Sequence, residues 1–491
     1  MLGLVRSIKN NFVPINKIPS EVLCLIPRYL EEDEGDGDLV TLTHVCRGWR
    51  ELFIANSSLW TRLDCQNADK TRVYIERSKS SPLKISLCGG ETVAYPEGAF
   101  LLVVPHVGRF KSLNIEGGVD PLRNLTPHLS CPIPLLSKLT INLDCDPVPV
   151  LNSTVFNGDL SSLCSLSLTG VITHLPWKNM SKLTTFELSF IPEGKISITQ
   201  LLDFFEDAHH LRDITLHRSI PISCNAPSGR VVSLPCLKNL TIFTESVHST
   251  LLNHLSIPAG ASLTLDFEFG GDRSPLPGLL PRTPGNLKNI FSITSVNLYL
   301  NRFEKRVRLD GPSGGLYMLG LLVLWDRASA PILDHRIVRS LNYFALSGTQ
   351  RLMVTRCNLP MAIEFIKSPS YCILHRMEDL RTLTLTQCNN LPFILALNPD
   401  LNPSKLILCP NLEELVLYVK KQSDFNLPEL MSMAEGRALG GRKLQSITIV
   451  GLGDLVPGKE VFKLKEHVGH VDYKFREEPP KWDSIYEDGD D

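Results

Sequence analysis

The sequence predicts an α/β repeat protein, in which a small N-terminal helical bundle precedes an irregular array of parallel strands. Two amphipathic stretches with helical spacing lie between Ile18 and Leu63. Beyond them a hexamer of the form L-x-x-L-x-L recurs, and its last residues alternate as a strand does. The chain of 491 residues is 43% hydrophobic and 21% charged, with a net charge of -2, which is typical of a folded soluble protein.

The first amphipathic stretch follows Ser20, a residue type that can cap a helix. At about 100° per residue, Val22, Leu23 and Ile26 fall within one arc, so one face of this helix is expected to be buried. Pro27 lacks a backbone N–H and should kink or shorten the helix. The acidic run at residues 31–38 is interpreted as a solvated loop rather than a site for a basic partner.

A second amphipathic helix is predicted after this loop, where Val45, Trp49 and Phe53 share an arc. A third apolar anchor, Trp60, comes just after the turn-like residues 56–58. A segment this short rarely forms a self-sufficient core, so part of its apolar surface should face the following domain or a partner.

The hexamer is clearest at seven places from Leu163 to Ile449. These are Leu163–Leu168, Leu183–Leu188, Leu211–Leu216, Leu237–Ile242, Leu380–Leu385, Leu412–Leu417 and Leu444–Ile449. In the full register the first positions, spaced by 20 to 33 residues, are Ser80, Phe110, Leu136, Leu163, Leu183, Leu211, Leu237, Gly260, Ile293, Leu319, Thr349, Leu380, Leu412 and Leu444. The clearest helix between two hexamers is predicted within Ile196–Asp213, where apolar residues recur at helical spacing.

The elements of the N-terminal segment, namely Pro19 opening a helix and then DL, VCRGWR and LW, resemble the F-box motif. The resemblance implies docking to the Skp-family adaptor of a cullin-RING (SCF-type) ubiquitin ligase. A plain helical cap on the following domain is the alternative. The implied adaptor-binding set, some of which would form the core of the bundle, is Ile18, Pro19, Val22, Leu23, Ile26, Leu39, Leu42, Val45, Cys46, Trp49 and Trp60.

The recurring hexamer resembles leucine-rich repeats, whose strands line the concave side of a curved array. The combined layout is similar to the expanded F-box families of mushroom-forming fungi. Strand positions between the leucines would face a partner, and they are mostly small and neutral. The target-binding candidates among them are Thr185, Glu187, Asp213, Thr215, Thr382, Thr384 and Glu414.

These patterns divide the chain into four parts. Residues 1–17 form a short lead, residues 18–64 the F-box and residues 65–466 the degenerate leucine-rich-repeat domain. Residues 467–491 form an acidic, proline-containing tail whose composition predicts disorder.

Several function classes find no support in the sequence. We find no nucleophile elbow, phosphate loop or zinc-protease motif, so we expect no enzyme, catalytic residue, cofactor or metal site. Thirteen cysteines without a C-x-x-C pair fit reduced thiols in an intracellular protein, cytoplasmic or nuclear. The balanced charge favours neither nucleic acid nor a membrane surface as partner.

Two hypotheses follow. The first is a substrate-recognition subunit of an SCF-type ubiquitin ligase, in which the F-box docks the adaptor and the repeats bind a protein target. The alternative is a repeat-based scaffold that binds proteins without delivering them to ubiquitination.

Overall fold

The chain is described from a computed structural model. The structure describes residues 13–27, 38–88, 97–118, 126–144, 148–151, 160–173, 180–192, 195–219, 229–244, 251–269, 284–290, 293–300, 304–311, 314–322, 341, 344, 346–356, 373–401, 407–420, 426–452 and 459–476. The chain divides into two compact units, Met1–Leu211 (unit 1) and Arg212–Asp491 (unit 2), which are treated separately here.

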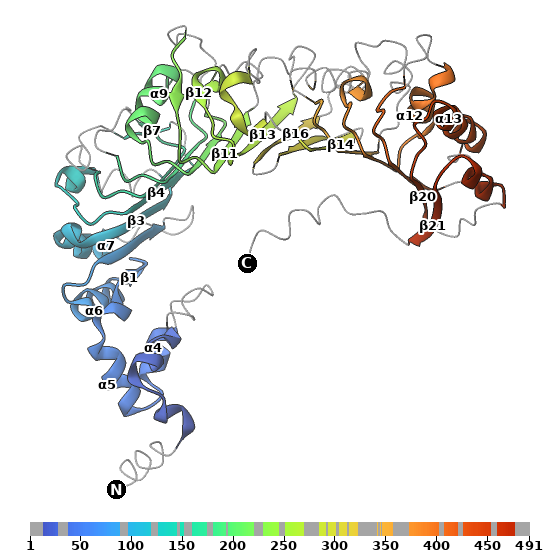
Figure 1. Cartoon of the computed structure of the whole chain (residues 1–491). Helices are drawn as coiled ribbons and strands as arrows, with labels where there is room; N and C mark the ends of the chain where they lie inside the picture. Colours follow the sequence, from blue (N-terminus) through green and yellow to red (C-terminus); the bar gives the residue numbers. More distant parts are fainter. Residues whose placement is uncertain are drawn as a thin grey trace. The chain divides into compact units, whose positions relative to one another are not determined.

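Unit 1 begins with the predicted helical bundle (Figure 1). Its elements are η1 (Pro14–Lys17), α2 (Ser20–Leu23), α4 (Asp38–Thr43), α5 (Arg47–Ala55) and η2 (Ser57–Trp60). The helix α2 ends at Leu23, where the N–H of Cys24 bonds the carbonyl of Ser20. This early end agrees with Pro27, which cannot donate to the carbonyl of Leu23. The acidic run at 31–38 lies outside the described residues except for Asp38, which begins α4.

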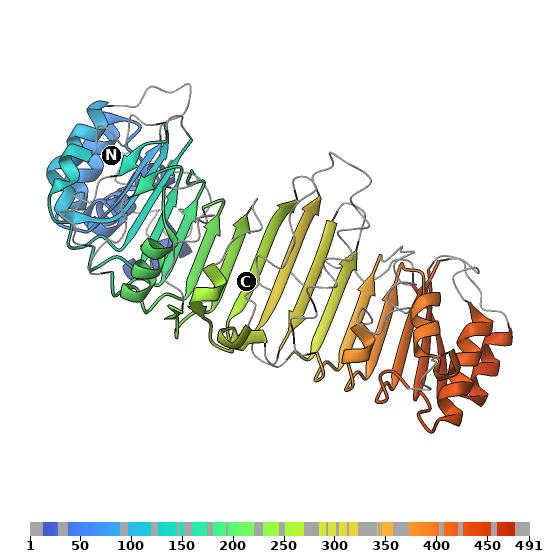
Figure 2. The ribbon, with the colours of Figure 1, turned by 90° about the horizontal axis from the view of Figure 1, so that it is seen from above.

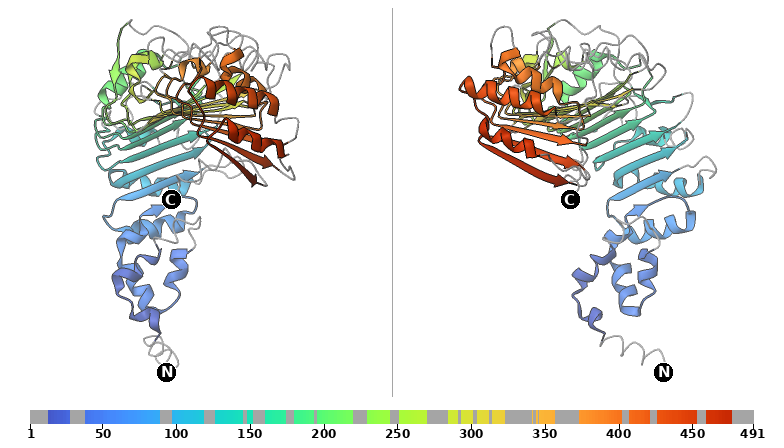
Figure 3. Two further views of the ribbon diagram at one scale, coloured as in Figure 1. Left: turned by 45° about the vertical axis from the view of Figure 1, so that its right-hand side comes forward. Right: turned by 90° about the vertical axis from the view of Figure 1, so that its right-hand side faces the viewer.

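Six strands of unit 1 pair in parallel in the order β1–β2–β3–β4–β6–β8. Figure 3 shows them stacked one above another, with α6, α7 and α9 on one side of the sheet in Figure 1. The bounds are β1 (Arg62–Leu63), α6 (Ala68–Ser78), β2 (Leu83–Cys88), α7 (Glu97–Val103), η3 (Val104–Arg109), β3 (Phe110–Gly117), η4 (Thr126–Ser130), β4 (Lys138–Leu143), β5 (Val150–Leu151), β6 (Ser165–Thr169), β7 (Ile172–Thr173), β8 (Thr185–Ser189) and α9 (Ile198–Asp207). The short strands β5 and β7 form a separate pair.

The hexamer register explains how these strands pack. Leu139 lies opposite Leu166, which lies opposite Phe186, and all three side chains are fully buried. Because successive side chains of a strand point to opposite faces, the residues between them form rows on the other face. The sheet of unit 1 therefore has one apolar face covered by the returning segments and one polar face.

The predicted return helix is confirmed as α9. Ser197 caps it, since its Oγ accepts from the N–H of Gln200 while the Gln200 side chain accepts from the N–H of Ser197. Its Phe204 and Phe205 rings pack on Phe186 of β8, at centroid distances of 4.6 and 6.2 Å. The helix thus covers the apolar face of the sheet.

A residue with left-handed backbone follows several strands and turns the chain away from the sheet. Gly170, with φ of 63°, follows β6, and its N–H bonds the carbonyl of Ser189 at the end of β8. A Cβ at Gly170 would meet the carbonyl of Leu143, so both the conformation and the space require glycine. In unit 2, Arg218 and Arg356 adopt the same conformation directly after β9 and β17.

Unit 2 holds eleven described strands paired in the order β9–β11–β13–β16–β15–β14–β17–β18–β19–β20–β21. Figure 2 shows its strands side by side. The bounds are β9 (Asp213–His217), β10 (Val232–Ser233), β11 (Asn239–Thr244), η6 (Leu251–His254), β12 (Leu255–Ser256), β13 (Ser262–Phe269), η8 (Pro284–Asn286), η9 (Lys288–Ile290), β14 (Ser295–Leu300), β15 (Glu304–Asp310), β16 (Gly315–Leu322), β17 (Arg351–Thr355), η11 (Ile373–Arg376), β18 (Thr382–Thr386), α12 (Leu391–Leu397), η12 (Pro399–Leu401), β19 (Glu414–Val419), α13 (Leu427–Leu439), β20 (Ser446–Leu452), η14 (Lys459–Glu466) and β21 (His470–Arg476). The strands β10 and β12 pair separately.

The middle of unit 2 departs from the predicted parallel order. The strand β15 is antiparallel to both β14 and β16, so β13 is followed in the sheet by β16 rather than by β14. Leu316 pairs with Leu263, which shows that the first position predicted at Leu319 is wrong. The run at 315–325 is apolar at most positions, so its sequence allows several alignments with the neighbouring strand. The antiparallel pairing with β15 fixes an alignment other than the predicted one.

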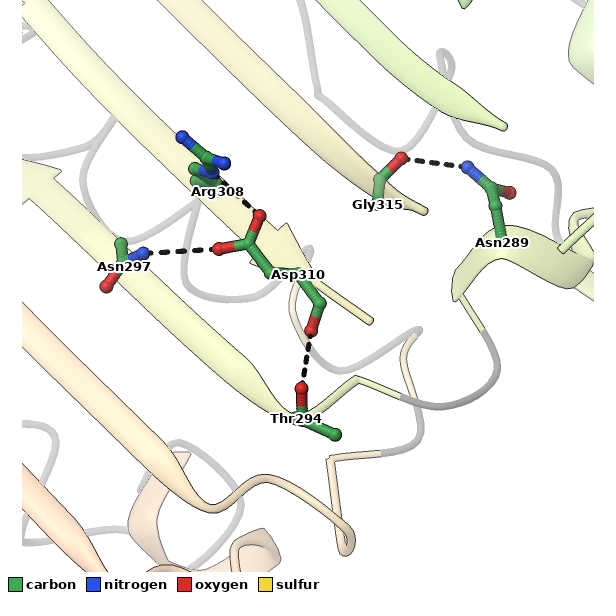
Figure 4. A network of polar contacts seen from close by, with 6 residues as sticks. All are labelled: Asn289, Thr294, Asn297, Arg308, Asp310 and Gly315. Carbon is green, nitrogen blue, oxygen red and sulfur yellow. Dashed lines mark hydrogen bonds and ion pairs between the residues drawn. The ribbon is translucent and has the colours of Figure 1, made fainter. Parts of the chain in front are cut away.

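Polar contacts fix this antiparallel segment, as Figure 4 shows. The Asp310 carboxylate pairs with the Arg308 Nε at 2.7 Å and accepts from the Asn297 amide at 3.4 Å. The Thr294 hydroxyl donates to the Asp310 carbonyl at 3.2 Å, and the Asn289 amide donates to the Gly315 carbonyl at 2.9 Å. These contacts tie the carboxyl end of β15 to β14 and the residue before it, and they tie η9 to the start of β16.

Two further expectations differ from the structure. In β2, Ile85 lies opposite Leu113 of β3, so the register predicted from Ser80 is displaced by two residues. A β-bulge at the start of β3 and the extra apolar residue Leu87 account for the displacement. The strand β21 also lies within the range 467–491, which was predicted to be a disordered tail; residues 477–491 lie outside the described part.

Partly or fully buried arginines on the returning segments bond carbonyl groups of the segment 28 to 35 residues earlier. Arg109 donates to the Ser81 carbonyl at 2.8 Å, and Arg376 donates to the Phe344 carbonyl at 2.6 Å. Arg437 of α13 is fully buried and donates to the carbonyls of Leu408 and Cys409, both at 2.9 Å. Burial lowers the pKa of the Arg437 guanidinium, so the carbonyl groups must compensate for its lost hydration.

Replacing Arg437 with alanine should destabilise the end of unit 2 by about 3 kcal/mol, because two buried carbonyl groups lose their donors. Hydrogen exchange of peptides covering β19 and β20 would measure the loss. The exposed Lys443 offers a matched control, and its change to alanine should alter the free energy of opening by less than about 0.5 kcal/mol. Equal protection in R437A and K443A would contradict the role given to Arg437.

Candidate functional site

The N-terminal bundle has a small aromatic core. Trp49 and Phe53 lie one turn apart on α5 with their rings edge to face at 5.5 Å, and Phe53 is completely buried. Leu23 of α2 and Leu39 of α4 are also buried. Leu23, Trp49 and Phe53 of the expected apolar arcs are therefore buried, whereas Val22 and Val45 of the same arcs are exposed.

Polar contacts fix the helix α5 within the bundle. Cys46 caps the helix, its Sγ accepting from the N–H of Trp49 at 3.5 Å. The Trp49 indole N–H donates to the Asn16 side chain at 2.7 Å, which ties the short helix η1 to α5. Arg50 donates to the carbonyl of Thr43 at the end of α4. The lead before Ile18 is therefore part of the bundle from Asn16 onward.

Exposed apolar side chains are concentrated in this bundle. Of the fifteen large hydrophobic residues exposed in the described part of the chain, six lie within residues 13–45. These six are Val13, Ile15, Val22, Leu25, Val40 and Val45, with exposed fractions from 40 to 56%. The exposed apolar residues of the described part of the chain are thus most numerous in its N-terminal bundle.

Trp60 joins the bundle to the strands that follow. It is fully buried, and its indole N–H donates to the carbonyl of Phe53 at 2.8 Å. Its ring packs edge to face on Tyr74 of α6 at 4.9 Å, and the Arg77 guanidinium lies 4.3 Å from the ring. Two residues later Arg62 begins β1, so no linker separates the bundle from the sheet.

Comparison with protein families identifies this bundle. Residues 15–66 match the family model described as F-box-like. The chain carries an F-box-like domain. The matched range includes Asn16, which bonds the Trp49 indole, and β1, which follows Trp60 directly. No curated protein and no solved structure matches the chain.

The structure divides the residues predicted to bind an adaptor into three groups. Pro19, Val22 and Val45 are exposed, and Ile18, Ile26, Leu42 and Cys46 are partly exposed. Leu23, Leu39, Trp49 and Trp60 are buried in the F-box-like domain or at its junction with α6. Direct contact with a partner is therefore open to the first two groups, whereas the buried four support the surface from below.

The target-binding candidates all lie on the polar face, as the strand alternation predicts. In unit 1, Glu187 of β8 accepts a hydrogen bond from the Ser167 hydroxyl at 2.9 Å, and Thr185 lies beside it on the same strand. In unit 2, Asp213 and Thr215 lie on β9, and Asp213 accepts from the Asn239 amide at 2.7 Å.

The remaining candidates lie on two neighbouring strands of unit 2. Thr382 of β18 is opposite Glu414 of β19, and its hydroxyl donates to that carboxylate at 3.4 Å. Thr384 follows on the same face of β18. The candidates of unit 2 thus form two small groups, one on β9 and one on β18 and β19.

Sequence reasoning missed a group of cations on the polar face of unit 1. Lys84 of β2 and Lys138 of β4 lie in one row, separated by Ser112 of β3. The register predicted from Ser80 was displaced by two residues, which placed Lys84 in a different row. Aligning Ile85 rather than Leu83 with Leu113 would have found the row.

The described residues hold free thiols but no cluster of potential metal ligands. No group of three or more His, Cys, Asp or Glu side chains in the described ranges could hold a metal ion. The nine cysteines there are free thiols, and burial raises the pKa of the Cys65 thiol to about 12. Among the same residues, none of the helices is both long and apolar enough to span a membrane.

Replacing Trp60 with alanine should destabilise both the F-box-like domain and α6, by about 3–5 kcal/mol, because a large cavity would open between them. Hydrogen exchange should then accelerate in peptides from α5 and from α6. W60F would keep most of the packing and lose only the bond to Phe53, at about 1 kcal/mol. Faster exchange in α5 alone would show that Trp60 belongs to the bundle and does not join it to α6.

Proposed function

We propose that the chain is a substrate-recognition subunit of a cullin-RING (SCF-type) ubiquitin ligase. The match of residues 15–66 to an F-box-like domain carries this proposal. In it, the F-box-like domain docks a Skp-family adaptor, and the strands that follow, as leucine-rich repeats, hold a protein target. Such a subunit is not itself an enzyme, since it accelerates ubiquitin transfer by holding the target near the charged enzyme.

The exposed apolar residues of the F-box-like domain support adaptor docking. Val22 and Val45 are 47 and 56% exposed; Val22 precedes the buried Leu23 on α2, and Val45 precedes Cys46, which caps α5. A partner that covered these side chains would remove apolar area from water without any rearrangement of the core.

The polar face of the parallel strands supports target binding. Its exposed side chains are held in rows by the strand register, which gives a preorganised surface for an extended partner. We place this activity inside the cell, in the cytoplasm or nucleus, since an SCF-type ligase works there.

Changing Val22 and Val45 together to glutamate should weaken adaptor binding by at least about tenfold, because two charges would be buried in an apolar interface. Co-elution of the purified full chain with a Skp-family adaptor, followed by titration, would measure this. Both positions are exposed, so circular dichroism should show an unchanged fold.

A matched control is available on the same unit. Leu101 of α7 and Val150 of β5 are 59 and 48% exposed and lie outside the F-box-like domain. L101E with V150E should leave adaptor binding unchanged. Unaltered binding in the V22E/V45E variant would exclude this surface as the docking site, and a wild-type chain that fails to bind any adaptor would favour the scaffold alternative.

A further inference from the structure

A basic hollow lies on the polar face of unit 1, where the sheet begins. It has a volume of about 610 Å³ and extends over β1, β2, β3 and β4. Four cationic side chains line it, namely Arg62, Lys84, Lys111 and Lys138. A volume of this size is within the range of sites that enclose a small ligand or one large side chain.

Strand register and a β-bulge bring these cations together. Arg62 lies opposite Lys84, which lies opposite Ser112, which in turn lies opposite Lys138. Neighbouring strands are about 4.8 Å apart, so Lys84 and Lys138 start only about 10 Å from each other. The bulge turns two consecutive residues, Lys111 and Ser112, away from the core, which adds a fourth cation to the row.

The lysines of this row lack acidic partners. No carboxylate of the described part of the chain forms an ion pair with Lys84, Lys111 or Lys138. Two cations on strands of unit 2 do have acidic partners, since Arg308 pairs with Asp310 and Lys474 with Asp472. Like charges on neighbouring strands destabilise a sheet, so the fold gains nothing from this row.

The hollow also offers neutral hydrogen-bond donors. The hydroxyls of Ser112 and Thr140 line it and have no hydrogen-bond partner in the described ranges. The single carboxylate in its lining, Glu116, lies near the carboxyl end of β3, where it accepts from the Asn114 amide at 2.8 Å. The positive charge is thus confined to the end of the hollow where the strands begin.

We propose that this hollow binds a phosphorylated serine or threonine of the target protein. A phosphate carries close to two negative charges on compact oxygen atoms, which suits several cations and hydroxyls around one point. A run of carboxylates would extend along the strands, over the neutral row of Ser86 and Asn114 and toward the negative charge of Glu116. The charge distribution therefore favours one concentrated anion.

This inference rests on the proposed function, in which the strands hold a protein target. It adds that the target is phosphorylated, and it places the binding site for the phosphate in the hollow. The hollow begins on β1, directly after the F-box-like domain, so a phosphorylated segment would be held beside the adaptor-docking bundle of the same unit.

The test uses the full chain and three fluorescent peptide libraries. The libraries have degenerate flanking positions around a central phosphoserine, glutamate or serine, and fluorescence anisotropy at physiological salt measures binding. We expect the phosphoserine library to bind at least about tenfold more tightly than the other two. K84E combined with K138E should abolish this preference.

Control variants separate a specific site from a general effect of charge. Lys182 and Lys195 are exposed lysines of unit 1 outside the hollow, so K182E with K195E makes the same change in net charge and should preserve the preference. Equal loss in both double variants would overturn the proposal. So would equal binding of the phosphoserine and glutamate libraries, absence of binding, or competition by single-stranded RNA at the same phosphate concentration.

Adaptor co-elution is measured on the same samples. If the wild-type chain binds the adaptor but shows no preference for phosphoserine, only the phosphate site is wrong. If it binds neither adaptor nor peptide, the proposed function fails as well.

Discussion

In each unit, a strand can satisfy its backbone N–H and C=O groups only by pairing with its neighbours in one register. That register stacks Leu139, Leu166 and Phe186 of unit 1 in a buried row, and it stacks Leu383, Leu415 and Ile447 of unit 2 in the same way. A slip by one residue would expose every one of these side chains. The same pairing also arranges the polar residues in rows, so the surface available to a partner is a direct consequence of the core.

The returning segments hold this register from the other face. These segments differ in length and do not all contain the same helix, so different contacts hold them against the sheet. The aromatic rings of α9 cover Phe186, while Arg376 and Arg437 bond carbonyl groups one return earlier. An arginine can serve here because its planar donors reach two carbonyls at once, which compensates for the loss of hydration on burial.

The sequence predicts the periodic parts of this structure and misses the places where the period changes. The leucine register placed β6, β8, β11 and β18 correctly, and apolar residues at helical spacing within Ile196–Asp213 predicted α9. Antiparallel pairing of β15, the bulge at Lys111 and the last strand β21 were missed, because each depends on which strand becomes the neighbour. The resemblance to the F-box motif also put Val45 and Trp60 in one adaptor-binding set, although Trp60 is buried against α6 and Val45 is exposed.

Trp60 connects the F-box-like domain to the first strands of unit 1, and this connection bears on the proposed function. Under the proposed function, ubiquitin transfer depends on the distance between the adaptor and the bound target, and a flexible linker would spread that distance over many values. Here the indole of Trp60 bonds the backbone of α5 and packs on α6, and Arg62 pairs with β2 only two residues later. The F-box-like domain and the first strands of unit 1 are therefore directly connected. A target held on β1 to β4 would keep a fixed position relative to the adaptor, whereas a target held only beyond unit 1 would not share this short connection.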